Sequence, residues 1–143
     1  AIGQNVTARH PVEQDIEQAV KEADLLIGAV LIPGAKAPHL VSAEQVKLMK
    51  AGSVIIDISV DQGGCIETTR PTTYENPTFV WEDVIHFGVT NMPGAVPRTS
   101  TQALSAVLLP YVLQLCEVDW QSNSALSSGI NVQNGEIILP ALG

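Results

Sequence analysis

The sequence contains few aromatic and few basic residues. Aromatic side chains make up 4% of its 143 residues, and 7 lysines and arginines stand against 15 aspartates and glutamates, for a net charge of −8. A chain this acidic repels phosphate backbones, and so few rings offer little surface for base stacking. We therefore expect no nucleic-acid partner.

Cysteines and long apolar runs are also scarce. Cys65 and Cys116 stand apart, without a Cys-x-x-Cys pair or a Cys/His ladder, so the pattern favours neither a disulfide framework nor a metal site. The longest apolar run, 25–33, is much shorter than the ~20 residues that cross a bilayer, and no basic leader precedes it. We expect a cytoplasmic protein without a membrane partner or a metal.

What is present indicates a well-buried α/β domain. Hydrophobic residues make up 45% of the chain, and apolar strand-like segments lie at 4–9, 24–28, 53–60 and 84–89. They alternate with two helical patterns, one that begins near Pro11 and one that runs from a capping box of Ser42 and Gln45 through Lys50. Parallel strands need crossover connections, so this alternation predicts a parallel sheet with both faces covered. The segment between the last two strands is predicted to be a polar loop.

The character of the sequence changes near its end. An apolar helical pattern begins at Thr99 and contains Pro110 as a kink or break, and Asn134-Gly135 between apolar residues predicts a hairpin. A helix and a hairpin do not extend a parallel sheet. We therefore assign residues 1–97 to one domain and residues 98–143 to a connecting helix and part of a second domain.

Three loops rich in glycine and proline follow three of the predicted strands, at 30–38, 61–71 and 91–97. In a parallel sheet these loops meet at one edge, where open α/β sheets bind their ligands. The sequence therefore predicts a ligand crevice there. A G-x-G-x-x-G phosphate loop, which would mark the first half of a dinucleotide-binding sheet, is absent.

Asp61 is the acid best placed in this crevice, directly before Gln62 and two glycines. It either hydrogen-bonds a ligand or caps an ordinary turn. Asp57 is predicted to be a buried structural acid, and Arg70 either contacts a ligand or is solvated. Cys65 lacks a nearby histidine and is not expected to be a nucleophile. The histidines share no ligand spacing and are expected to be surface or packing residues: His10, His39 and His86.

Three segments resemble the family of alanine dehydrogenase and the NAD(H)-binding subunit of pyridine nucleotide transhydrogenase. They are ADLLIGAVLIPGAKAPHLV, GSVIIDISVDQGGCIETTRPTTYENPTF and NMPGAVPRTSTQAL. The Asp-Gln-Gly-Gly form at 61–64 favours the alanine dehydrogenase branch. The resemblance implies the distal half of a Rossmann-like domain, followed by a helix and hairpin that return to a substrate domain.

The resemblance also implies an activity. It is the reversible oxidative deamination of L-alanine to pyruvate and ammonia, with NAD as hydride acceptor, in a homohexamer. Asp61 corresponds to the family's active-site aspartate. The cofactor contacts fall, many through the backbone, on Val30, Leu31, Ile58, Ser59, Val60, Asp61, Arg70, Val89, Thr90, Asn91 and Met92.

The chain departs from the family in two ways. His10-Pro11 occupies the region where members often carry a serine that contacts the adenosine end. The family's catalytic lysine and histidine belong to an N-terminal domain that this sequence lacks, so we expect the chain alone to be inactive and to be the distal part of a complete enzyme. The alternatives are a transhydrogenase-type NAD(H)-binding subunit and a non-catalytic binding fragment.

Overall fold

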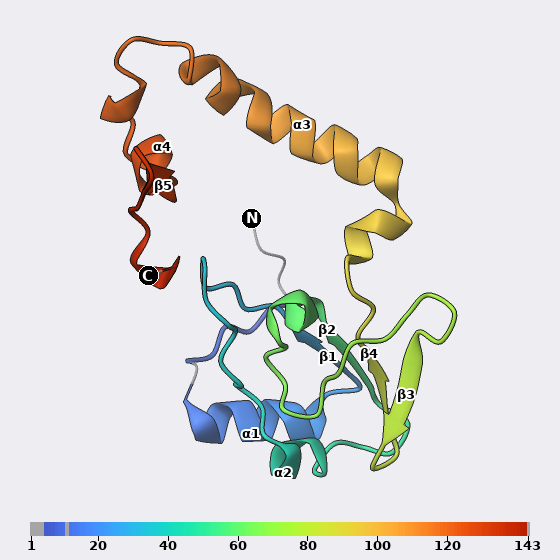
Figure 1. Cartoon of the computed structure of the whole chain (residues 1–143). Helices are drawn as coiled ribbons and strands as arrows, with labels where there is room; N and C mark the ends of the chain where they lie inside the picture. Colours follow the sequence, from blue (N-terminus) through green and yellow to red (C-terminus); the bar gives the residue numbers. More distant parts are fainter. Residues whose placement is uncertain (1–4, 11, 143) are drawn as a thin grey trace. The chain divides into compact units, whose positions relative to one another are not determined.

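The computed structural model describes residues 5–10 and 12–142 (Figure 1). The chain forms two compact units. The first consists of Ala1–Ile32 and Lys36–Thr90, and the second of Pro33–Ala35 and Asn91–Gly143.

A four-stranded sheet forms the centre of the first unit. Its order is β1-β2-β4-β3, with β1, β2 and β4 parallel and β3 antiparallel to β4. The strands are β1 (Leu25–Gly28), β2 (Val54–Asp57), β3 (Thr78–Trp81) and β4 (Val84–Phe87). The predicted α/β fold with a parallel sheet is therefore confirmed.

β3 lies in the segment that the sequence predicts to be a polar loop, and that prediction is wrong. Glu82 and Asp83 both adopt positive φ, 47° and 60°, so the chain reverses within two residues and β3 pairs with β4 as a hairpin. Aspartate tolerates this left-handed conformation better than most residues, although the pair lacks the glycine that usually marks such turns. The feature of the sequence that favours a strand here is the aromatic and β-branched character of the β3 residues.

Two helices cover one face of the sheet. α1 (Glu13–Glu22) and α2 (Ala43–Val46) follow the predicted helical patterns, and α2 begins with the predicted capping box between Ser42 and Gln45. α2 is shorter than predicted, because the amides of Leu48 and Met49 bond to carbonyls three residues back. Such bonds are those of the tighter 3-10 conformation, so the α-helix ends there.

The two faces of the sheet differ. Alternate residues of β2 and β4, among them Ile55, Val84 and His86, are buried in the core together with Val20 and Val46 of the helices. On the opposite face Leu25 and Ile27 are more than half exposed, and Val80 is exposed as well. The prediction that both faces are covered is wrong for the described residues.

Two predicted strands also need correction. Residues 5–9 form no strand, since they pair with no neighbour, while Gln4 and Pro11 lie outside the described residues. The strand predicted at 53–60 ends at Asp57, and Ile58–Gln62 form a 3-10 helix, η1. The predicted strand 84–89 ends at Phe87.

The second unit contains the predicted helix, α3 (Pro97–Gln114), which continues through Pro110 without a break. The predicted hairpin is confirmed: β5 (Val132–Gln133) pairs with β6 (Glu136–Ile137). Both turn residues have positive φ, as the two-residue hairpin turn requires. The shorter elements are η2 (Met92–Ala95), η3 (Trp120–Ser122), α4 (Ser124–Ser128) and η4 (Pro140–Leu142). In the part of the chain that the structure describes, no helix has the length and hydropathy to cross a bilayer.

Candidate functional site

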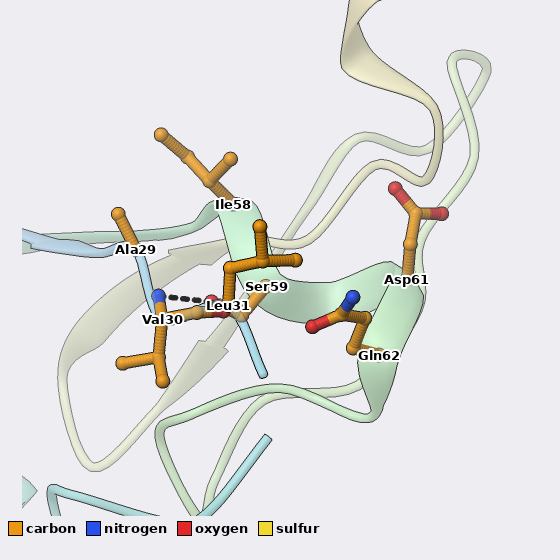
Figure 2. Close-up of a pocket in the computed structure, with 7 residues that line it drawn as sticks. All are labelled: Ala29, Val30, Leu31, Ile58, Ser59, Asp61 and Gln62. Atoms are coloured by element: carbon orange, nitrogen blue, oxygen red, sulfur yellow. Dashed lines mark hydrogen bonds between the residues drawn. The ribbon is translucent and has the colours of Figure 1, made fainter. Parts of the chain in front are cut away.

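The carboxyl ends of β1 and β2 open onto a hollow of about 370 Å³ (Figure 2). The two strands are parallel, so the segments that follow them meet at the same edge of the sheet. One wall comes from the loop after β1 and the other from η1. The lining residues are Ala29, Val30, Leu31, Ile58, Ser59, Asp61 and Gln62.

The buried carboxylate of Asp57 explains why β2 ends where it does. Its side chain is 0% exposed and accepts the backbone N–H of Ser59 at 2.9 Å, of Cys65 at 2.9 Å and of Ile66 at 3.2 Å. The first of these bonds caps η1 and the other two hold the returning loop. Asp57 therefore has the structural role that the sequence predicts, at the end of the strand rather than within it.

The glycine after η1 allows the chain to turn back. Gly63 has φ +92° and its N–H bonds to the carbonyls of Ser59 and Val60, so it ends the helix in the left-handed conformation that glycine adopts without strain. A Cβ at this position would lie 2.6 Å from Cε of Lys36, whose side chain crosses the glycine. The capping acid of this turn is Asp57, while Asp61 is exposed within η1.

The polar groups of the hollow belong mainly to Ser59, Asp61 and Gln62. Ser59 Oγ bonds to both backbone groups of Val30, which joins the two walls. In Figure 2 the carboxamide of Gln62 points toward Leu31 and Ser59, whereas the carboxylate of Asp61 points away from them. Gln62 Oε1 is buried and has no hydrogen-bond partner among the described residues.

The hollow brings together five of the residues predicted from the sequence: Val30, Leu31, Ile58, Ser59 and Asp61. Val60 and Val89 are instead 4% and 1% exposed, so their side chains belong to the interior. Thr90 is half-buried at the end of the first unit, and Asn91 and Met92 belong to the second unit.

Arg70 lies in a different hollow of the first unit, of about 320 Å³. Its guanidinium carbon is 4.3 Å from the ring centroid of Phe79, a cation–π contact. Phe79 in turn stacks on His86 at 4.8 Å. Arg70 therefore has a structural contact in addition to its predicted ligand role.

Burial shifts the pKa of two titratable groups in the direction that favours their neutral forms. Burial raises the pKa of the Cys65 thiol, which is 2% exposed, and a thiol rather than a thiolate is a poor nucleophile. Burial lowers the pKa of His86. The His86 ring lies between the carbonyl of Val84, 3.0 Å from Nδ1, and the hydroxyl of Thr68, 2.8 Å from Nε2, so it is a packing residue.

Sequence reasoning missed two lining residues, Ala29 and Gln62. Gln62 directly follows the predicted acid Asp61, and this position in the same loop could have indicated that it lines the hollow. Ala29 gives no chemical signal, because its methyl side chain carries no group that binds or reacts. Among the described residues, no cluster of three or more histidine, cysteine or acidic side chains is arranged to hold a metal ion.

Comparison with known proteins decides the family. A family model described as alanine dehydrogenase/PNT, C-terminal domain, matches residues 1–140. The chain belongs to this family. The resemblance seen in the three sequence segments is therefore confirmed.

Several curated proteins that are similar to this chain are named alanine dehydrogenase. The protein of Mycolicibacterium smegmatis is 50% identical over 98% of this chain and 39% of its own length. Alanine dehydrogenase of Mycobacterium tuberculosis is 49% identical over 93% of this chain and 37% of its own length. The chain thus spans about two fifths of the length of the relatives it matches.

Solved structures agree with the fold. A structure of L-alanine dehydrogenase superposes on this chain with a TM-score of 0.77 at 49% sequence identity. The match covers 99% of this chain and 40% of the chain of that structure. A transhydrogenase from Sinorhizobium meliloti gives a TM-score of 0.68 at 24% identity, over 91% of this chain and 36% of that one. The second likeness shows the shared fold alone.

Proposed function

We propose that this chain is the nucleotide-binding part of an NAD-dependent L-alanine dehydrogenase. The reaction is the reversible oxidative deamination of L-alanine to pyruvate and ammonia. The observation that carries the proposal is the identity of about 50% to alanine dehydrogenases, which extends over 98% of the chain. The longer polypeptide, called the complete enzyme below, supplies the catalytic lysine and histidine and the glycine-rich loop.

The residues of the hollow fit the nicotinamide end of NAD. Val30, Leu31 and Ile58 provide apolar walls, and such walls exclude water from a hydride path. The buried Gln62 Oε1 lacks a partner within the described residues, so a polar group is available beside these apolar walls. NAD, when bound, accepts the hydride. The other proposed contacts are Ser59, Arg70, Thr90, Asn91 and Met92, together with the backbone of Val60 and Val89, whose side chains face the interior.

We assign the catalytic role in this chain to Asp61. It lines the hollow and is exposed at the far end of η1, where a carboxylate can hydrogen-bond a ribose or take part in proton movement. Its position is fixed by the capped turn that begins at Asp57 and ends at Gly63. Asp61 thus presents a charged group from a rigid support.

The remaining features of the proposal concern the assembly. Residues 1–97 form the distal part of the dinucleotide-binding domain, and residues 98–143 return to the substrate domain. The complete enzyme is a cytoplasmic homohexamer. The apolar side chains along α3, such as Val107 at 63% exposure and Leu113 at 60%, support a role in contacts with other parts of this assembly.

The test begins with the coding sequence that flanks this chain. The complete enzyme should convert L-alanine and NAD into pyruvate, ammonia and NADH, with NADP and L-serine as control substrates. Absence of alanine-dependent NADH formation by a folded protein would contradict the proposal.

Replacing Asp61 by asparagine should reduce kcat of the complete enzyme by roughly 100-fold or more, the usual size of a general acid–base contribution. The fold should persist, because Asp61 is exposed. Asp83→Asn is a matched control at an exposed acid outside the hollow. A near-normal kcat in Asp61→Asn would remove Asp61 from the catalytic assignment.

A further inference from the structure

A single hydroxyl joins the two walls of the hollow. Ser59 Oγ accepts the N–H of Val30 at 2.7 Å and donates to the C=O of Val30 at 2.9 Å. Ser59 is 5% exposed, so water does not compete freely for these bonds. The dashed line in Figure 2 crosses from η1 to the loop after β1 at this point. The position of Val30 relative to η1 is therefore set by Ser59.

The hydroxyl is itself held in place. The N–H of Ser59 donates to Oδ1 of Asp57, whose Oδ2 accepts the N–H groups of Cys65 and Ile66. A continuous set of hydrogen bonds thus leads from the returning loop through Asp57 and Ser59 to Val30. A wall supported in this way keeps its spacing without help from a ligand.

These bonds limit what the residues offer to a ligand. The N–H of Val30 is already donated and the proton of the Ser59 hydroxyl is already used, so neither is available as a donor in the hollow. The side chain of Val30 packs against the core. The neighbouring Leu31 presents an exposed apolar side chain to the hollow, and the Ser59 bonds to Val30 determine its distance from Ile58. A flat ring between two apolar walls depends on that distance for its contacts.

We propose that Ser59 is a positioning residue for the nicotinamide ring. Its hydroxyl sets the spacing between the Val30–Leu31 wall and the Ile58–Gln62 wall, and it acts through Val30 rather than by bonding to the ring. The inference rests on the proposed function, which places the nicotinamide end of NAD in this hollow.

The test compares two ligands in the complete enzyme. ADP-ribose has every part of NADH except the nicotinamide ring, so it reports the rest of the site. Loss of two hydrogen bonds in Ser59→Ala should raise the Kd of NADH by roughly 5- to 30-fold and leave the Kd of ADP-ribose within about twofold, by titration calorimetry. In turnover, the KM for NAD should rise by a larger factor than kcat falls.

Ser53→Ala is the matched control. Ser53 is also 5% exposed, but its Oγ makes no hydrogen bond in the described part of the chain. Removing this oxygen should leave both Kd values unchanged. Ser59→Thr keeps the hydroxyl and should restore NADH affinity toward that of the wild type.

Four outcomes separate the hypotheses. Equal weakening of NADH and ADP-ribose in Ser59→Ala, or no weakening of NADH, would overturn the positioning role. If Ser59→Ala does not fold, hydrogen exchange in the wild-type enzyme tests the positioning role. Free exchange of the Val30 amide without NADH, in an enzyme that binds ADP-ribose and turns over alanine, would overturn that role. A wild-type enzyme with no alanine activity would contradict the proposed function instead.

Discussion

The two units of the chain differ in how much of their surface they bury. The first unit has a core in which Val46, Ile55 and Val84 are 0% exposed. In the second unit no described residue is buried, and α3 carries exposed side chains such as Leu104 at 59% and Val107 at 63%. The first unit therefore has a hydrophobic core of its own, whereas the second unit leaves its apolar side chains exposed.

The largest expected effect concerns the acid that organises the first unit. Asp57→Ala leaves three buried N–H donors without an acceptor. At about 1–3 kcal/mol per orphaned group, it should lower the free energy of opening of β2 by roughly 3–9 kcal/mol. Hydrogen exchange of β2 amides in the complete enzyme measures this.

Asp24→Ala is the control for this change. Its side chain is 86% exposed and pairs with Lys50 at 2.7 Å, and exposed pairs contribute up to about 1 kcal/mol. A similar small effect from both variants would show that Asp57 does not organise the strand end.

The same substitution in both units tests the comparison directly. Ile55→Ala removes a 0% exposed side chain and should cost about 2–5 kcal/mol. Ile137→Ala removes one that is 56% exposed, and in the isolated chain should change stability by about 0.5 kcal/mol or less. Equal losses in hydrogen exchange would mean that the second unit has its own core.

Two glycines in the left-handed conformation provide a finer test. Gly63 has φ +92° beside Lys36, and Gly135 has φ +86° with nothing within 4 Å of an added Cβ. Alanine at either position should cost about 1–2 kcal/mol. The loss at Gly63 should spread through the first unit and weaken NADH binding, while the loss at Gly135 should stay within the β5–β6 hairpin. Amide exchange resolved by residue distinguishes the two.

The smallest expected effect is a pH dependence confined to the first unit. Burial lowers the pKa of His86. The unfolded chain therefore binds a proton at this side chain near pH ~6.5, whereas the folded unit binds it only at a lower pH. The stability contributed by neutral His86 is therefore present above pH ~6.5 and is lost as the pH falls below it.

His86→Gln should flatten this slope when opening free energies of the first unit are compared between about pH 7.5 and about pH 5.5. His39→Gln is the control, because His39 is exposed. An unchanged slope in His86→Gln would assign the pH dependence to another group.

Sequence patterns predicted the elements whose signals are local. The capping box at Ser42, the apolar runs of β1 and β2 and the Asn134-Gly135 turn each depend on residues a few positions apart, and each is present. The edge of the sheet that carries the hollow also followed from the order of strands and loops. β3 was missed because its turn, Glu82-Asp83, has no glycine.

Other features depended on residues far apart in the sequence. The sequence alone determined that the chain is an acidic α/β protein with glycine-bearing loops at one sheet edge, because periodicity and turn chemistry act locally. Only the tertiary structure decided that β2 ends at Asp57, that Ser59 holds Val30 across 29 positions of sequence, and that Val60 and Val89 face the interior. Those outcomes are set by which buried polar groups find partners, and partners distant in sequence meet only when the sheet has formed.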